Sequence, residues 1–407
     1  MDRSRGLDRA AARRGGRALV VVADACGVGA LPDAARYGDL GANTLAHVAE
    51  AVGGLRLPAL QRLGLGSVTA LRGVRPAGDP AIHGRLHPLG PGKDSATGHW
   101  ELMGAVLERP LPTYPDGFPP DVLARLRAAM GRELICNRPY NGIAAIEDFG
   151  SEALRSGALI LYTSQDSVLQ LAAHDERVAA AELYRACVAA RAAMAGEHAV
   201  GRVIARPFTG VEGAFERTEG RRDFALAPPG RTYLQELADA GVAVHGVGKI
   251  KDLFAGVGVA HSHPGATNAQ ALASSDALLE RLDHGLVFVN LIETDQLYGH
   301  RKDVVGFAAA LGQLDAHVAR WVAGLREDDL LIVTADHGVD PAHAGSDHTR
   351  EYAPLLALTG SMARARADGG RFGGARHDGP LADVGASVLR WLTGRDTDEL
   401  PGEAFLG

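Results

Sequence analysis

The chain has 407 residues, a length that corresponds to two or three domains of ordinary size. Apolar residues make up 46% and charged residues 22% of the chain, a balance that excludes an intrinsically disordered protein. The formal net charge of −7 argues against binding to nucleic acid through overall basicity, so we expect no nucleic-acid partner.

The N-terminal segment, MDRSRGLDRAAARRGG, is Arg-rich and has no apolar stretch, so we expect residues 1–16 to be a disordered basic arm. Asp2 and Asp8 interrupt the basic run, which disfavours a transit peptide. The three cysteines form no C-x-x-C pair, and no segment approaches 18 uninterrupted apolar residues. We therefore expect a cytoplasmic protein with no disulfide framework and no membrane partner.

Short apolar runs alternate along the chain with amphipathic stretches of helical length. The expected strands are Ala18–Ala23, Ala158–Tyr162, Arg202–Ala205, Val242–Val247, Leu286–Ile292 and Leu330–Thr334. The expected helices include Thr232–Ala240, Asn268–Leu282, Val304–Leu325 and Asp383–Leu392. This alternation predicts an α/β fold with a mostly parallel sheet flanked by helices.

Two loop-like segments divide the chain. One is the Pro-rich run LERPLPTYPDGFPPD, and the other is ERTEGRRDFALAPPGR, which precedes a helix. The section between them is expected to be an inserted α/β cap domain. The predicted organisation is a core in two parts, 17–110 and 231–407, with the cap at 111–230.

Acidic residues and histidines follow the predicted core strands. In open α/β sheets, ligands bind beyond the carboxyl ends of the strands. A single aspartate there is more often a helix N-cap, but this many metal-type residues at strand ends are not expected by chance. Six such ligands suit two metal ions, and a mixed Asp/His set suits Mn²⁺ or Zn²⁺. The predicted ligands are Asp24, Asp295, His300, Asp336, His337 and His348.

The segment GPGKDSATGHWELMG offers two hydroxyls, Ser95 and Thr97, in a turn before a helical stretch. A helix N-terminus presents free N–H groups to an anion, and two metals in this style usually clamp a phosphoryl or sulfuryl group. We favour Thr97 as the nucleophile because Gly98 removes steric bulk beside it. The structural alternative is that either residue simply caps the helix.

These residues carry a resemblance to the phosphopentomutase family of the alkaline phosphatase superfamily. The similar blocks include GKDSATGHWELMG, LYTSQDSVLQLAAHDE, RVIARPFTG, GVGKIKDLFAGVG and TADHGVDPAHAGSDHTREYAPLL. The DHG motif alone is typical of the whole superfamily, whereas the run through DHTREY points to this family. The resemblance covers nearly the whole chain after residue 17 and implies an alkaline-phosphatase-like core with an inserted cap.

The resemblance also implies roles for individual residues. Thr97 matches the threonine that becomes phosphorylated. Asp24, Asp336 and His337 match the ligands of one metal, and Asp295, His300 and His348 match those of the other. The residues that match sugar or phosphate contacts are Asp166, Arg202, Arg206 and Lys249.

The resemblance implies an isomerase that interconverts ribose 1-phosphate and ribose 5-phosphate, together with the 2-deoxyribose phosphates, in nucleoside catabolism. The implied cofactors are two Mn²⁺, with Zn²⁺ as an alternative, and a sugar bisphosphate primer such as ribose 1,5-bisphosphate or glucose 1,6-bisphosphate. The implied partner is a small pentose phosphate, and the sequence leaves the oligomeric state open.

The chain departs from the family pattern at three places, which leaves the exact sugar open. Cys26 stands where Phe is usual, Glu293–Gln296 reads Glu-Thr-Asp-Gln instead of Asp-Phe-Asp-Met, and residues 141–144 replace a Ser-Gly-Thr-Glu pattern. The alternatives are a paralogous mutase for another sugar phosphate and a two-metal phosphatase. A formylglycine sulfatase is disfavoured because Thr97 cannot be oxidised to the aldehyde. A cofactor-independent phosphoglycerate mutase normally uses Ser, and a metal-loaded scaffold without catalysis is disfavoured by the complete ligand set.

Overall fold

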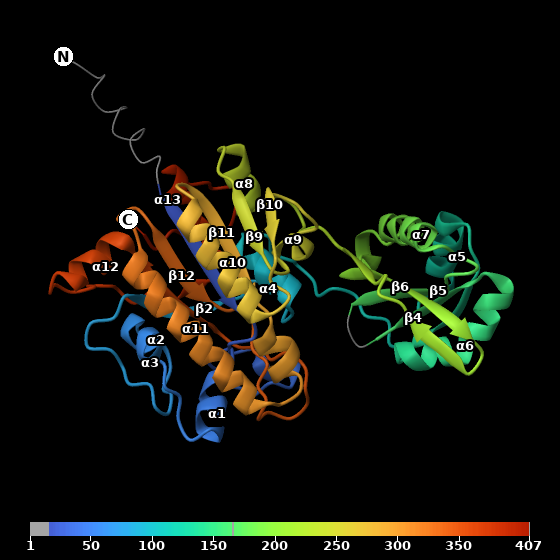
Figure 1. Cartoon of the computed structure of the whole chain (residues 1–407), viewed down its shortest axis with the longest axis horizontal. Helices are drawn as coiled ribbons and strands as arrows, with labels where there is room; N and C mark the ends of the chain where they lie inside the picture. The colour runs from blue at the N-terminus through green and yellow to red at the C-terminus, as the bar shows by residue number, and fades with distance from the viewer. Residues whose placement is uncertain (1–15, 165–166, 407) are drawn as a thin grey trace, which may run out of the picture. The chain divides into compact units, whose positions relative to one another are not determined.

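The computed structural model describes residues 16–164 and 167–406. The chain forms two compact units, which are drawn in Figure 1. The first unit joins the described residues up to Arg109 with those from Pro228 onward, and the second is Pro110–Ala227. The expected arm at 1–16 lies outside the described residues, apart from Gly16.

The first unit is built on an eight-stranded sheet. Its spatial order is β10 (His261–His263), β9 (Val244–Val247), β11 (Gly285–Leu291), β1 (Arg17–Ala23), β12 (Leu330–Thr334), β13 (Ala353–Thr359), β2 (Ile82–His87) and β14 (Gly379–Pro380). The five strands from β10 to β12 are parallel, while β13 is antiparallel to both of its neighbours. Every residue of β1, β11 and β12 is buried, as expected for strands of a parallel sheet covered on both faces. The predicted α/β class with a mostly parallel sheet is confirmed.

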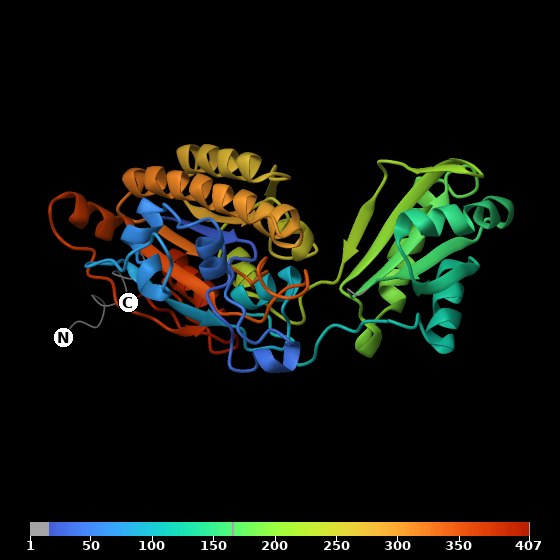
Figure 2. The same cartoon turned by 90° about the horizontal axis from the view of Figure 1, so that it is seen from below.

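Helices cover both faces of this sheet. The long helices α10 (Asn268–Arg281) and α11 (Val304–Gly324) lie side by side over one face, as Figures 1 and 2 show. On the other face, α13 (Asp383–Thr393) packs on β1 and β12 and also contacts α4 (Ser95–Leu102) and α8 (Tyr233–Asp239). The remaining helices are η1 (Ala34–Tyr37), α1 (Thr44–Ala51), α2 (Pro58–Leu63), α3 (Leu65–Val68), α9 (Ile250–Leu253), η3 (Thr294–Gly299) and α12 (Gly360–Ala367).

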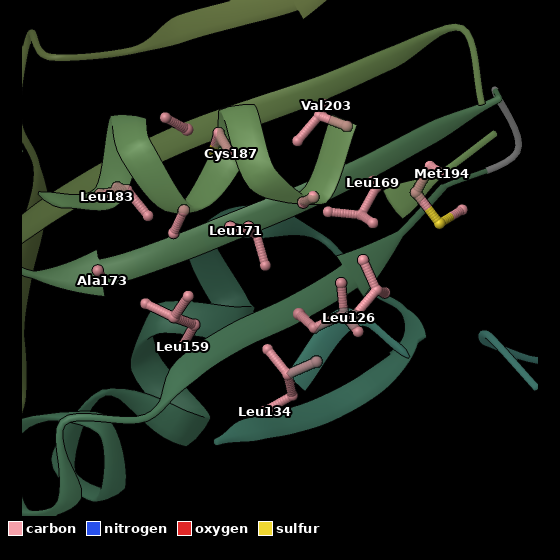
Figure 3. Close-up of a cluster of buried hydrophobic side chains, with 14 of the residues drawn as sticks. Leu126, Leu134, Leu159, Leu169, Leu171, Ala173, Leu183, Cys187, Met194 and Val203 are labelled. Atoms are coloured by element: carbon pink, nitrogen blue, oxygen red, sulfur yellow. The ribbon is translucent and has the colours of Figure 1, made fainter. Parts of the chain in front are cut away.

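The second unit has its own six-stranded sheet. Its strands run in the order β3 (Leu134–Pro139), β4 (Leu159–Thr163), β5 (Val168–His174), β6 (Arg202–Val211) and β7 (Ala214–Arg217), and β8 (Arg222–Ala225) pairs with β6. Helices α5 (Pro120–Met130) and α7 (Ala180–Ala193) pack on one face through the leucine-rich cluster drawn in Figure 3. Helix α6 (Gly142–Ser156) packs on the other face, and η2 (Gly196–His198) follows α7.

No helix among the described residues is both long enough and apolar enough to cross a membrane.

Candidate metal and phosphoryl site

The predicted metal ligands gather at one edge of the core sheet. Asp24 follows β1, Asp295 lies in η3 just after β11, and Asp336 follows β12. These three strands are neighbours and run parallel, so their carboxyl ends meet at the same edge. His337 is the next residue after Asp336. His300 follows η3, and His348 lies in the loop between β12 and β13, and both are part of the same cluster.

The six side chains form one continuous cluster. The ligand atoms of Asp295, His300 and His348 all lie within 4.8 Å of one another, and so do those of Asp24, Asp295 and His337. Asp336 joins the second group, because its Oδ2 lies 3.4 Å from Nε2 of His337. Asp295 therefore stands between the two groups, although the family resemblance assigns it to only one metal.

The charges in this cluster favour cations. Asp24 and Asp336 are no more than 4% exposed, and burial together with the charges of Asp336 and Asp295 raises the pKa of Asp24 well above its ordinary range. The buried Oδ2 of Asp336 makes no hydrogen bond of acceptable geometry among the described residues, although Nδ1 of His99 and Nε2 of His337 lie within 3.4 Å of it. Buried carboxylates of this kind normally pair with a cation or bind a metal. The residues present thus fit divalent metal ions.

His300 and His348 both lie close to the carboxylate of Asp295. Nε2 of His300 lies 3.2 Å and Nε2 of His348 lies 3.4 Å from Oδ1 of Asp295. The hydrogen bond to Asp295 raises the pKa of His300 to about 9. A divalent cation held by the same atoms would take the place of these protons.

The helix that carries the candidate nucleophile begins at this cluster, but it presents a different hydroxyl from the one we favoured. Oγ of Ser95 lies 3.1 Å from Nε2 of His337 and 3.4 Å from Oδ1 of Asp24. The hydroxyl of Thr97 instead donates to Oδ2 of Asp94, at 2.8 Å, in the capping box of α4. The geometry therefore favours Ser95 over Thr97 as the group that meets a phosphoryl at the metal site.

Gly98 also has a different role from the one expected. A Cβ on Gly98 would lie 2.6 Å from the carbonyl oxygen of Asp336 and 2.8 Å from its Cβ. Gly98 thus allows α4 to pack directly against the strand end that carries Asp336. It does not serve to free space around the Thr97 hydroxyl, which packs on Gly92.

Two buried residues that the sequence reasoning missed support the ligands. Nδ2 of Asn290 donates to Oδ2 of Asp24 at 2.8 Å and lies 3.3 Å from Nε2 of His99. Nδ1 of His99 lies 2.8 Å from the carbonyl oxygen of Ser95 and 3.1 Å from Oδ2 of Asp336. The sequence carries a signal for each of them, because His99 follows Ser95 by one helical turn and Asn290 is a polar residue inside a buried strand.

The loop before α4 is held by buried charged groups. The carboxylate of Glu101 accepts from the backbone N–H groups of Leu89 and Gly90, and burial raises the pKa of Glu101 to about 7. Arg350 donates to the carbonyl oxygen of Gly92 at 2.6 Å. These contacts fix the entry of the chain into the helix that carries Ser95.

The predicted sugar contacts fall in both units. Lys249 precedes α9 in the first unit, and its charge lowers the pKa of Asp24, so it acts on the metal-ligand cluster. Asp166 lies outside the described residues. Within the second unit, Arg202 and Arg206 both belong to β6, four residues apart. The structure thus brings together the six predicted metal ligands and leaves the roles of the sugar contacts as predictions.

The surroundings of Arg206 are strongly basic. Its Nε donates to Oε1 of Gln170, and burial and the charges of Arg221 and Arg217 lower its pKa. The buried hydroxyl of Tyr162 lies in the field of the same guanidinium groups and has no hydrogen-bond partner of acceptable geometry among the described residues. Asp223 is the carboxylate that pairs with Arg221. This face of the second unit therefore suits an anionic ligand.

The chain is similar to several known proteins. The family model of the metalloenzyme superfamily matches residues 16–394. A phosphopentomutase of Carboxydothermus hydrogenoformans is 48% identical over 343 residues, which is 84% of this chain and 88% of that protein. A phosphopentomutase of Desulfitobacterium hafniense is 44% identical over 393 residues, covering 96% of this chain and 99% of its own. A solved phosphoglycerate mutase of Leishmania mexicana is 12% identical with a TM-score of 0.49, over 96% of this chain and 97% of its own.

Proposed function

The chain belongs to the phosphopentomutase family of the alkaline-phosphatase-like metalloenzyme superfamily and is an isomerase that moves a phosphoryl group within its substrate, and from this premise we propose its substrates and mechanism. The proposed reaction interconverts ribose 1-phosphate and ribose 5-phosphate, and the corresponding 2-deoxyribose phosphates. The observation that carries the mechanism is the Ser95 hydroxyl, which stands at a helix N-terminus against Asp24 and His337.

Two divalent cations, Mn²⁺ or Zn²⁺, would neutralise charge on the transferring phosphoryl group and lower the pKa of the attacking hydroxyl. The ligands proposed to hold them are Asp24, Asp295, His300, Asp336, His337 and His348. The N-terminus of α4 adds the positive end of the helix dipole at the same point, while the side chain of Asp94 accepts the backbone N–H groups of Ala96 and Thr97.

The proposed cycle starts from phosphorylated Ser95. The free hydroxyl of a bound pentose monophosphate attacks the phosphorus, the bond from phosphorus to Oγ of Ser95 breaks, and the proton of the sugar hydroxyl ends on Ser95. The resulting 1,5-bisphosphate reorients in the site. Its other phosphoryl group is then transferred to Ser95 by the reverse of the first step. A sugar bisphosphate such as ribose 1,5-bisphosphate or glucose 1,6-bisphosphate would prime the unphosphorylated enzyme.

The second unit is proposed to supply sugar and phosphate contacts and to exclude water from the bisphosphate. Arg206, with the guanidinium groups of Arg217 and Arg221 beside it, supports this role because the excess positive charge suits a phosphate. Arg202, Asp166 and Lys249 complete the proposed substrate contacts. Exclusion of water matters because hydrolysis of the phosphoenzyme would turn the mutase into a phosphatase.

The function is tested by assaying the Mn²⁺-loaded enzyme with ribose 5-phosphate after priming with glucose 1,6-bisphosphate. Ribose 1-phosphate should form with almost no release of inorganic phosphate. Release of inorganic phosphate at the rate of substrate turnover would show that the protein is a two-metal phosphatase and not a mutase.

A paralogous mutase for another sugar phosphate is the second candidate, and a departure of the cap sequence from the family pattern supports it. Asn141 caps α6, with its Oδ1 accepting from Ile143 and Ala144, where the family pattern has a serine. A panel of pentose and hexose monophosphates ranked by kcat/KM separates the two. A hexose phosphate ranked above both pentose phosphates would overturn the pentose assignment.

A further inference from the structure

Three histidines meet at the outer edge of the core sheet, and none of them belongs to the six-residue cluster. His245 lies on β9, and His261 and His263 lie on β10, the edge strand. The parallel register pairs His261 directly with His245. Because side chains alternate along a strand, His263 points to the same face as His261, so all three imidazoles share one face.

The three rings lie close together, although their nitrogen atoms do not all converge within 4.8 Å as the ligand atoms of the phosphoryl site do, so His261 would have to turn to complete a metal site. The ring centroid of His245 lies 4.6 Å from that of His261 and 5.3 Å from that of His263. Nδ1 of His245 lies 3.1 Å from Nε2 of His263. Two imidazole nitrogens bound to one tetrahedral Zn²⁺ at ordinary bond lengths are about 3.3 Å apart. His245 and His263 thus share a ring–ring hydrogen bond at nearly the separation of a chelating pair, and a bound ion would take the place of the shared proton.

Exposure and the lowered pKa of His245 also suit metal binding. His245 is 8% exposed, His263 is partly buried, and His261 is exposed, so the cluster has one side open to solvent and a third ring with room to turn. Burial lowers the pKa of His245 to about 4 and also lowers that of His263, to which His261 and Arg281 contribute. His245 is therefore neutral near pH 7, which is the form that binds metals.

The donor set differs in kind from that of the phosphoryl site. In the described part of the chain, no carboxylate lies within ion-pair distance of the three rings, whereas the phosphoryl site has three aspartates. All-imidazole sets suit Zn²⁺, Ni²⁺ and Cu²⁺, while carboxylate-rich sets suit Mn²⁺. The two places would thus select different metals from a mixture.

We propose that His245, His261 and His263 form a third divalent-metal site, selective for Zn²⁺-type ions, with water completing the coordination. The bound ion would tie the edge strand β10 to β9. Because β10 has only three residues, such a tie would add stability at an edge with few ladder hydrogen bonds of its own. The proposal does not depend on the mutase reaction.

The test counts total bound metal on the full-length enzyme after dialysis against Mn²⁺ and limiting Zn²⁺, by elemental analysis. The total is used because exchange of Mn²⁺ for Zn²⁺ at the phosphoryl site leaves it unchanged. The wild type should hold about three ions per chain, and His263→Asn and His261→Asn should each hold about two. Zn²⁺ affinity at the third site should fall by at least a hundredfold in these variants, since a direct ligand is lost.

His317→Ala serves as the matched control, because His317 is a partly buried histidine on α11 that contacts Asp276 and Trp321. It should keep the wild-type count. Substitution of Co²⁺ gives a second readout. The visible absorption of a tetrahedral nitrogen site should appear when the spectrum of the His261→Asn enzyme is subtracted from that of the wild type. His261 is exposed, so that variant should fold normally. A wild-type total of two, or equal totals in wild type and both variants, would overturn the proposal.

Discussion

The hydroxyl of Ser95 lies 3.1 Å from Nε2 of His337, while the hydroxyl of Thr97, two residues along the same helix, is held by Asp94. Successive residues of an α-helix are about 100° apart around its axis, so positions 95 and 97 face nearly opposite directions. Only one of these hydroxyls can therefore face the metal ligands for a given docking of α4. The structure docks the Ser95 side.

The first prediction separates these two hydroxyls. Ser95→Ala should lose mutase activity by about a thousandfold or more, because it removes the proposed phosphoryl carrier. Thr97→Val, which keeps the volume and removes the hydroxyl, should retain activity within about tenfold and lose stability by about 1 kcal/mol from the weakened capping box. Phosphopeptide mapping after priming should find the phosphoryl group on Ser95. An active Ser95→Ala enzyme together with an inactive Thr97→Val enzyme would return the assignment to Thr97.

The second prediction concerns the residue that orients Asp24. Asn290→Ala removes the 2.8 Å hydrogen bond to Oδ2 of Asp24 and should weaken metal binding by about 10- to 100-fold. Equilibrium dialysis with Mn²⁺ measures the affinity, and saturating metal should restore much of kcat. Asn137→Ala in the second unit, which removes hydrogen bonds to Phe118, should cost stability without changing metal affinity. Equal metal affinities in wild type and Asn290→Ala would refute this role.

The third prediction follows from Glu101, whose pKa is raised from its ordinary 4.5 to about 7 by burial. A carboxyl with a raised native pKa binds more protons when folded than when unfolded. Its contribution to stability is therefore complete below the unfolded pKa and is lost as the pH rises through the folded one. The free energy of unfolding of the wild type relative to Glu101→Gln should fall between about pH 4.5 and 7 and then level off. Denaturant titrations across this range measure it, and a pH-independent difference between the two proteins would contradict the assignment.

The fourth prediction uses two glycines in helices. Gly98→Ala should destabilise the protein by about 1–3 kcal/mol, because the new methyl group would overlap the backbone of Asp336. It should also weaken metal binding by displacing that ligand. Gly312→Ala on α11, where nothing lies within 4 Å of the new Cβ, should stabilise the protein by about 0.5–1 kcal/mol. Thermal unfolding of both variants decides this, and equal melting temperatures would argue against the close approach of α4.

Much of the core could be predicted because its signals are local. The run LVVV is apolar throughout and LLIVT is apolar up to Thr334, which is typical of strands buried on both faces, and both runs form strands within a residue of their expected bounds. The short strands β10 and β14 went unpredicted because they have three and two residues and no hydrophobic pattern. Likewise β13 was missed, although APLLALT is apolar, because periodicity alone does not separate a buried strand from a buried helical turn.

The sequence by itself determined the α/β class and the family, and it indicated the six residues that cluster, because the three aspartates follow recognisable strands and the three histidines belong to recognisable motifs. Tertiary structure alone decided how those ligands share space, with Asp295 between the two groups, and which hydroxyl faces them. It also decided that His245 stands beside His261 and His263, since the pairing of β9 with β10 sets that register. Local patterns specify which residues end a strand; only the docking of helices and the register of neighbouring strands specify which side chains meet.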